Sequence, residues 1–305
     1  MLARGQNVFF VELVDVLRGE LELLGITTSI TVGEFPAPAP ARVYVVLPPH
    51  EYASLEGPGI VSDGAVLART MVVSAEQPGS EWFDRNLDWA AAGAVFDINP
   101  RGVDAYRRHG VEAALLPLGY TAAWDTSREV RDWDDGRDID VLFLGCRSDR
   151  RDDVLARCAD VFGRYSTELV ISDNSRPNVA TSDNFVAGAD KWALLRRARV
   201  VLNLHRDDQP YFEWLRVVEA VHAGAVVVTE RSTGMAPLRA GRDVVVTSAE
   251  SLPWVLDHTL SDEPGLRVTR RAALETLRDR PMGAAAATLA FTAASLTNRP
   301  VPVGR

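Results

Sequence analysis

The stretch that most constrains the fold is a pair of mainly apolar runs joined by an amphipathic helix. The runs cover residues 200–204 and 225–229, and a helix is expected over residues 212–223 between them, ended by Gly224. Continuous apolar runs, unlike alternating ones, are typical of parallel strands that are covered on both faces. The stretch therefore predicts a βαβ unit, and such units bind their ligands at the carboxyl ends of the strands.

The same alternation of strands and helices runs through the whole chain, which indicates an α/β protein with parallel sheets. Its expected members include a strand over residues 26–32 and a helix over residues 149–162. A polar, charge-dense segment over residues 125–137 interrupts it and is interpreted as a linker between two Rossmann-like domains that face a cleft. The final helix is expected to cross back. The predicted domains are an N-terminal Rossmann-like domain 1–124, the linker 125–137, a C-terminal Rossmann-like domain 138–281, and a C-terminal helix and tail 282–305.

Composition narrows the functions that are open to such a chain. The 305 residues carry a net charge of −9, which disfavours nucleic acid as a partner. The two cysteines, Cys146 and Cys158, exclude a disulfide framework and predict a cytoplasmic protein. No apolar run is long enough to span a bilayer, and the first residues do not resemble a signal peptide.

Charged residues at the edge of the βαβ unit predict a site for a nucleoside diphosphate. Arg216 and Glu219 lie three residues apart and share one helix face. Arg216 falls in the first turns, where the helix dipole and the guanidinium both favour a phosphate, whereas a carboxylate one turn later suits two ribose hydroxyls. A surface ion pair is the alternative. Gly145 and Arg147 after the strand 140–144, and His205 after the strand 200–204, would complete this site, whereas Arg150 and Arg151 are expected to be solvated.

Two further strand ends, in the first half, carry candidate site residues. His50 and Glu51 follow one strand, and Glu76 and Gln77 follow another. A histidine beside a carboxylate can act as base and orienter, although Glu51 could instead cap the next helix. No metal site is expected, because the five histidines are scattered and no HExxH or CxxC motif occurs. The absence of GxSxG and GxxxxGK[ST] argues against a hydrolase triad and a P-loop enzyme.

Several strings together resemble the two-domain GT-B glycosyltransferases of the bacterial group-1 type, close to the spore-maturation-like members. The most extensive is VVLNLHRDD…FEWLRVVEAVHAGAVVVTE over residues 200–230. LLPLGY at 115–120 resembles the segment that enters the interdomain cleft, and DVLFLG at 140–145 resembles the first strand of the donor domain. SAEQPG and PHEY resemble acceptor-side loops. The family's glutamate pair has its first member eight residues before the second, where this chain has Tyr211, and the family's first acceptor-domain strand is missing.

The resemblance implies metal-independent transfer of a sugar from a nucleoside-diphosphate sugar to a small-molecule or glycan acceptor, with no cofactor. It also implies that domain 1–124 is the acceptor-binding domain and domain 138–281 the nucleotide-sugar-binding domain. A GT-B-like nucleotide-sugar epimerase and a non-catalytic nucleotide-sugar-binding protein remain open as alternatives, as do the donor, the acceptor and the oligomeric state. His50 and Glu76 are the expected catalytic residues, and Glu51 and Gln77 the expected acceptor-binding ones. The expected donor-binding residues are Gly145, Arg147, His205, Arg216, Val217 and Glu219.

Overall fold

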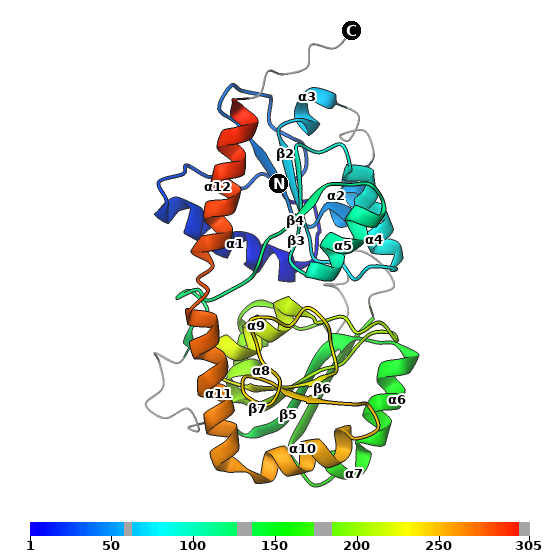
Figure 1. Cartoon of the computed structure of the whole chain (residues 1–305). Coiled ribbons are helices and arrows are strands. Elements are labelled where there is room, and N and C mark those ends of the chain that lie inside the picture. The colour runs from blue at the N-terminus through cyan, green and yellow to red at the C-terminus, as the bar shows by residue number, and fades with distance from the viewer. Residues whose placement is uncertain (58–62, 127–135, 174–184, 299–305) are drawn as a thin grey trace. The chain divides into compact units, whose positions relative to one another are not determined.

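The computed structural model describes residues 1–57, 63–126, 136–173 and 185–298, which form two compact units (Figure 1). Unit 1 comprises Met1–Pro117 and Met282–Arg305, and unit 2 comprises Leu118–Pro281. The predicted linker at 125–137 lies mostly outside the described residues. The chain passes between the units at two other places, after Pro117 and after Pro281.

Unit 1 is built on four parallel strands in the order β1-β2-β3-β4. Each strand follows its neighbour by way of helical connections, as parallel pairing requires. All five residues of β2 are buried, in agreement with the three consecutive apolar residues at its centre, 71–73. The strands are β1 (Tyr44–Val46), β2 (Thr70–Ser74), β3 (Ala94–Asp97) and β4 (Ala113–Leu115).

Helices cover both faces of this sheet. Figure 1 shows α1 and α12 on one side and α2, α4 and α5 on the other. The C-terminal helix α12 packs against α1, so the chain's last helix returns to the unit in which the chain began. The helices are α1 (Val8–Leu23), α2 (Pro49–Glu56), α3 (Gly64–Leu67), α4 (Glu81–Asn86), a 3-10 turn (Leu87–Trp89), α5 (Pro100–Arg108) and α12 (Gly283–Thr297).

The strand predicted over residues 26–32 is wrong. Its β-type pairing is a single bridge between Leu2 and Val32, flanked by hydrogen bonds from Leu2 N to Thr31 O and from Gly33 N to Leu2 O, both 2.9 Å. Ile26, Ile30 and Val32 are 40%, 37% and 55% exposed, so the part of the chain that the structure describes does not cover them with a complete second layer. Without that burial, the β-branched residues do not suffice to form a strand.

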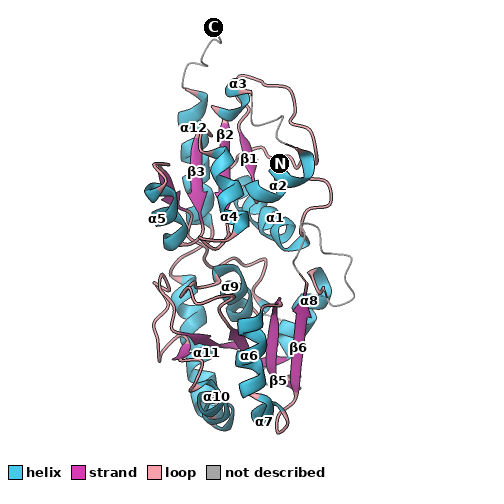
Figure 2. Ribbon diagram, turned by 90° about the vertical axis from the view of Figure 1, so that its right-hand side faces the viewer, coloured by secondary structure: helices cyan, strands magenta, loops and turns pink. Residues whose placement is uncertain are grey.

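Unit 2 is built on five parallel strands in the order β6-β5-β7-β8-β9. Figure 2 shows β5 and β6 as adjacent arrows in the lower part of the molecule. The predicted βαβ unit is confirmed, since β7 and β8 pair in parallel and Gly224 turns the chain between them with a φ of 74°. The strands are β5 (Ile139–Cys146), β6 (Thr167–Ser172), β7 (Ala198–Asn203), β8 (Val226–Glu230) and β9 (Val245–Thr247).

The core of unit 2 is formed by the apolar strand residues together with one face of several helices. The helix predicted over residues 149–162 is divided into two at Cys158, whose side chain is fully buried. The helices are α6 (Asp149–Arg157), α7 (Ala159–Phe162), α8 (Gly188–Arg197), α9 (Trp214–His222), α10 (Leu252–Ser261) and α11 (Glu263–Arg278).

The two chain passages come together within unit 2. The Tyr120 N–H donates to Arg280 O at 2.9 Å, and Tyr120 forms a parallel bridge with Pro281. Gly119 lies against the same carbonyl, and a Cβ there would approach Arg280 O to 1.8 Å. Across the described ranges, no helix has both the length and the apolar character to cross a bilayer.

Candidate functional site

The carboxyl edge of unit 2 contains a topological switch point at β5. From β5 the chain proceeds to β6 on one side and later returns to β7 on the other side. The loops after β5 and β7 therefore diverge, and such divergence opens the crevice in which α/β sheets bind ligands. Arg147 follows β5 and His205 follows β7, as the sequence predicted, whereas Gly145, expected after the strand 140–144, is a residue of β5 because the strand pairs with β6 as far as Cys146.

Gly145 has a packing role that the sequence did not reveal. A Cβ at this position would lie 2.7 Å from the tip of the Phe143 ring, within the same strand. The glycine therefore leaves room for a fully buried aromatic residue beneath the loop.

Helix α9 carries Arg216 to the same edge. The helix begins at Trp214, whose indole nitrogen donates to Gly234 O at 2.9 Å. Arg216 Nη1 donates to Asn203 Oδ1 at 3.0 Å, at the end of β7. Burial lowers the pKa of Arg216, and the neighbouring Glu213 opposes this. Val217 is fully buried and its N–H donates to Glu213 O, so it offers a ligand no side-chain atom.

Glu219 is held by a buried ion pair. Its Oε1 accepts a hydrogen bond from Lys191 Nζ on α8 at 2.6 Å, and the two side chains are 6% and 1% exposed. The predicted alternative, a surface pair between Arg216 and Glu219, is not what the structure shows. The carboxylate is instead anchored from a neighbouring helix.

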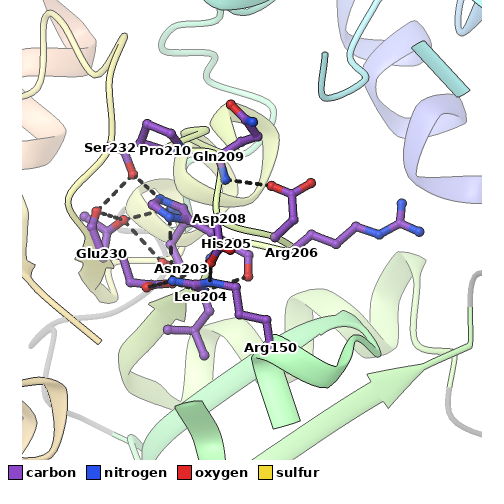
Figure 3. Close-up of polar contacts among 12 residues, drawn as sticks. Arg150, Asn203, Leu204, His205, Arg206, Asp208, Gln209, Pro210, Glu230 and Ser232 are labelled. Carbon is purple, nitrogen blue, oxygen red and sulfur yellow. Dashed lines mark hydrogen bonds and ion pairs between the residues drawn. The ribbon is translucent and has the colours of Figure 1, made fainter. Parts of the chain in front are cut away.

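His205 belongs to a polar network that joins the start of α6 to the chain that follows β7 and β8 (Figure 3). The backbone N–H of His205 donates to Glu230 Oε2 at 2.8 Å, and its ring Nε2 lies 2.8 Å from Ser232 Oγ. Arg150 donates to both Glu230 oxygens, at 3.0 and 2.5 Å. Burial lowers the pKa of His205, which keeps the imidazole neutral. The network fixes the ring between the ends of β7 and β8.

Three arginines near the end of β5 have different roles. Arg147 is 66% exposed and pairs with Asp152 at 3.3 Å, so it is accessible to a ligand. Arg150 and Arg151 were interpreted from the sequence as solvated, which is wrong. Arg151 is 1% exposed and donates to the carbonyls of Leu204 and Cys146, which ties β5 to β7.

At the carboxyl edge of unit 1, His50 and Glu76 are brought together. His50 Nε2 lies 3.5 Å from Glu76 Oε1, and the side chains are 4% and 20% exposed. The His50 ring is enclosed by Phe10 and Trp82, with centroids 6.2 and 5.8 Å away. Burial lowers the pKa of His50 to about 3, so the imidazole is neutral near pH 7 but a weak base.

Glu51 and Gln77 flank this pair. Glu51 Oε2 accepts the Asn7 N–H at 2.8 Å, and burial raises its pKa to about 7. It therefore binds the turn before α1, and it also lies in the first turn of its own helix, α2. Gln77 is buried, and its carbonyl accepts from Ser80, the N-cap of α4.

Two residues of the edge in unit 2 were missed by the sequence reasoning. Arg150 gives no local signal, because its partner Glu230 is 80 residues away. Lys191 does give one, because it is the only lysine in a chain with 33 Lys and Arg residues. A unique lysine in an arginine-rich chain could have singled out the position.

Two Rossmann-like units, with a C-terminal helix that returns to the first, define the GT-B fold. Residues 150–289 match the family model described as Glycosyl transferase-like. A search of curated protein sequences found no match. The resemblance seen in the sequence is therefore confirmed: the chain has the fold of GT-B glycosyltransferases, and its second unit contains a glycosyl transferase-like region.

Solved structures with this fold align over most of the chain. A glycosyltransferase from Rickettsia africae gives a TM-score of 0.57 at 10% identity, covering 96% of this chain and 93% of its own. HepE from Anabaena, in complex with UDP-glucose, gives 0.55 at 15% identity, covering 79% and 77%. A UDP-forming trehalose-phosphate synthase from Burkholderia xenovorans gives 0.51 at 12% identity, covering 82% and 72%.

Proposed function

We propose that this protein transfers a sugar from a UDP-sugar to an acceptor. The observation that carries the proposal is the placement of Arg216 and Glu219 on α9, beside the switch point of a unit that matches the glycosyl transferase-like family. The choice of UDP is supported by the fold neighbours, since the HepE structure is a complex with UDP-glucose and the trehalose-phosphate synthase is described as UDP-forming.

Arg216 and the start of α9 would bind the diphosphate. The first N–H groups of a helix and its dipole favour an anion, and a guanidinium adds paired hydrogen bonds. Arg147, exposed at the end of β5, would supply a second positive charge. These groups stabilise the departing nucleoside diphosphate directly, so no metal ion is required in the proposed mechanism.

Glu219 would bind the ribose. An ionised carboxylate accepts hydrogen bonds and donates none, which matches two neighbouring hydroxyl groups. His205, whose ring the Glu230 network fixes, would line the same site.

The acceptor would be bound by unit 1. Glu76 is the more exposed member of the His50–Glu76 pair, so it is the one that an acceptor hydroxyl reaches first. His50 would orient Glu76 by a hydrogen bond from Nε2. Glu51 and Gln77 would border the acceptor, and the pKa of Glu51, about 7, suits proton exchange near neutral pH.

The proposal is tested by calorimetry with UDP and by turnover of radiolabelled UDP-sugars. Glu219→Gln should weaken UDP binding roughly tenfold, because one charge-assisted hydrogen bond is lost. Glu275→Ala, which changes an exposed glutamate of unit 2, should leave the affinity unchanged. Unchanged binding in Glu219→Gln would refute the donor site.

Turnover separates the proposed activity from the two alternatives. A transferase forms a glycosylated acceptor and releases UDP. An epimerase converts the UDP-sugar without an acceptor, and a binding protein leaves the UDP-sugar intact. A panel of sugar and small-molecule acceptors with mass-spectrometric detection distinguishes the three.

A further inference from the structure

We infer that Lys191 is a positioning residue of the donor site, which keeps Glu219 ionised and aimed at the ribose hydroxyls. This inference rests on the proposed function, because it assigns a partner to the carboxylate that the proposal places against the ribose. It starts from the ion pair between α8 and α9.

Lys191 occupies a position that is unfavourable for a lysine in three respects. Its side chain is 1% exposed, although burying a charged ammonium is costly. It lies in the first turn of α8, where the helix dipole disfavours a cation. It is also the only lysine in the sequence, whereas every other residue of the Lys and Arg total is arginine. These costs require a specific compensation, which the Glu219 carboxylate provides at 2.6 Å.

A lysine fits this place better than an arginine would. The ammonium is compact, and it donates its hydrogen bond to Oε1 of Glu219. An arginine would engage both oxygens in a bidentate pair. The lysine therefore holds the carboxylate through Oε1 without imposing that bidentate geometry.

The ion pair also fixes the protonation state of Glu219. A buried carboxyl group without a partner has a raised pKa and is neutral near pH 7. Lys191 from α8 contacts Glu219, and Arg216 from the same helix as Glu219 interacts with it electrostatically. Both positive charges favour the ionised form. Removal of the Lys191 charge should therefore make ribose binding by Glu219 dependent on pH.

The test compares the affinities of UDP and 2′-deoxy-UDP, whose ratio measures recognition of one ribose hydroxyl. In the unmodified protein UDP should bind roughly tenfold tighter, and the ratio should stay constant between about pH 6 and about pH 9. In Lys191→Met the ratio should fall toward one near pH 7 and recover as the pH rises and Glu219 ionises. In Glu219→Gln it should stay near one at every pH.

A purely structural lysine gives a different result. Lys191→Met would then weaken both nucleotides equally, and the ratio would not change with pH, which overturns the inference. If Glu219→Gln keeps the full ratio, the ribose assignment fails, and the proposed donor site with it. If Glu219→Gln abolishes the ratio and Lys191→Met preserves it at all pH values, only the role of Lys191 fails.

A second measurement does not depend on a folded variant. Because the sequence has one lysine, labelling with [15Nζ]lysine produces one ammonium signal in the NMR spectrum of the full chain. Addition of UDP should shift that signal more than addition of 2′-deoxy-UDP. A signal that responds to neither nucleotide, or equally to both, contradicts the inference.

Discussion

Arg150 binds Glu230 through two nitrogens, at 3.0 and 2.5 Å, and thereby joins the start of α6 to the end of β8. Glu230 also accepts the backbone N–H of His205, so one buried carboxylate connects the start of α6 and the loop after β7 to the end of β8. Its side chain is 4% exposed, whereas that of Arg150 is 24% exposed. The carboxylate therefore depends on Arg150 for compensation of its charge.

Arg150→Ala should lower the free energy of unfolding by about 1–3 kcal/mol, since it leaves a buried carboxylate with an incomplete set of partners. Arg147→Ala, three residues earlier and just before α6, is the matched control. Arg147 is 66% exposed and Asp152 38% exposed, so the loss of that pair should cost about 0–1 kcal/mol. Urea denaturation measures both changes, and equal costs would contradict the role of Glu230.

Arg216→Gln should separate diphosphate binding from nucleoside binding. The glutamine keeps a donor for Asn203 but removes the charge at the start of α9. We expect UDP to bind roughly tenfold or more weakly, because a hydrogen bond to a charged group is lost, and uridine to bind with nearly unchanged affinity. Calorimetry with the two ligands measures the difference. A parallel loss of both affinities would indicate that Arg216 serves the fold rather than the phosphates.

Gly119→Ala should disrupt the junction of the two chain passages. A Cβ at this glycine would lie 1.8 Å from Arg280 O, so the hydrogen bond from Tyr120 N to that carbonyl could not keep its geometry. The expected cost is about 1–3 kcal/mol, the range for overpacking a tight contact. In the control Gly163→Ala, the nearest atom is 3.5 Å away, and the change should be neutral or slightly stabilising. Thermal unfolding compares the two variants.

Fold class could be predicted from the sequence because continuous apolar runs such as 225–229 report burial on both faces of a sheet. The segment 26–32 shows the limit of that reasoning. It has β-forming residues, but whether a second layer covers them depends on distant parts of the chain. The division of the helix 149–162 at Cys158 could not be predicted either. The helical periodicity of the sequence continues through Cys158, so no local signal marks the break.

Site residues were predictable where the signal was local. The approach of His50 to Glu76 followed from the rule that ends of parallel strands share an edge. The pairs Lys191–Glu219 and Arg150–Glu230 join residues 28 and 80 positions apart, and no spacing rule connects them. The burial of Val217 could be anticipated from its helix face. That its side chain is too buried to contact a ligand could not.

UDP affinity should be the same in EDTA and in millimolar Mg²⁺. In the proposed site, Arg216 and the start of α9 neutralise the diphosphate. Within the described residues, no group of three or more His, Cys, Asp or Glu side chains is arranged to hold a metal ion. Calorimetry under both conditions provides the measurement. An increase in affinity of tenfold or more with Mg²⁺ would show that the metal contributes to binding.

Stability should fall as the pH is lowered from about 6.5 toward about 4, in part because of His222. Its Nε2 accepts the N–H of Thr121 at 3.0 Å and its Nδ1 lies 2.7 Å from Val218 O, so the ring is held neutral with the proton on Nδ1. Burial lowers the pKa of His222 to about 4. Below about pH 6.5 the unfolded chain therefore takes up a proton that the folded chain excludes until about pH 4, and unfolding is favoured within this window.

The contribution of His222 is isolated by comparison with His222→Gln, in which this titration is absent. Between pH 7.5 and 4.5, the unmodified protein should lose roughly 2 kcal/mol more unfolding free energy than the variant, as measured by urea denaturation. His109→Gln, at an exposed histidine, should follow the unmodified protein. Parallel pH profiles for the unmodified protein and His222→Gln would mean that Thr121 and Val218 do not hold the ring in its neutral form.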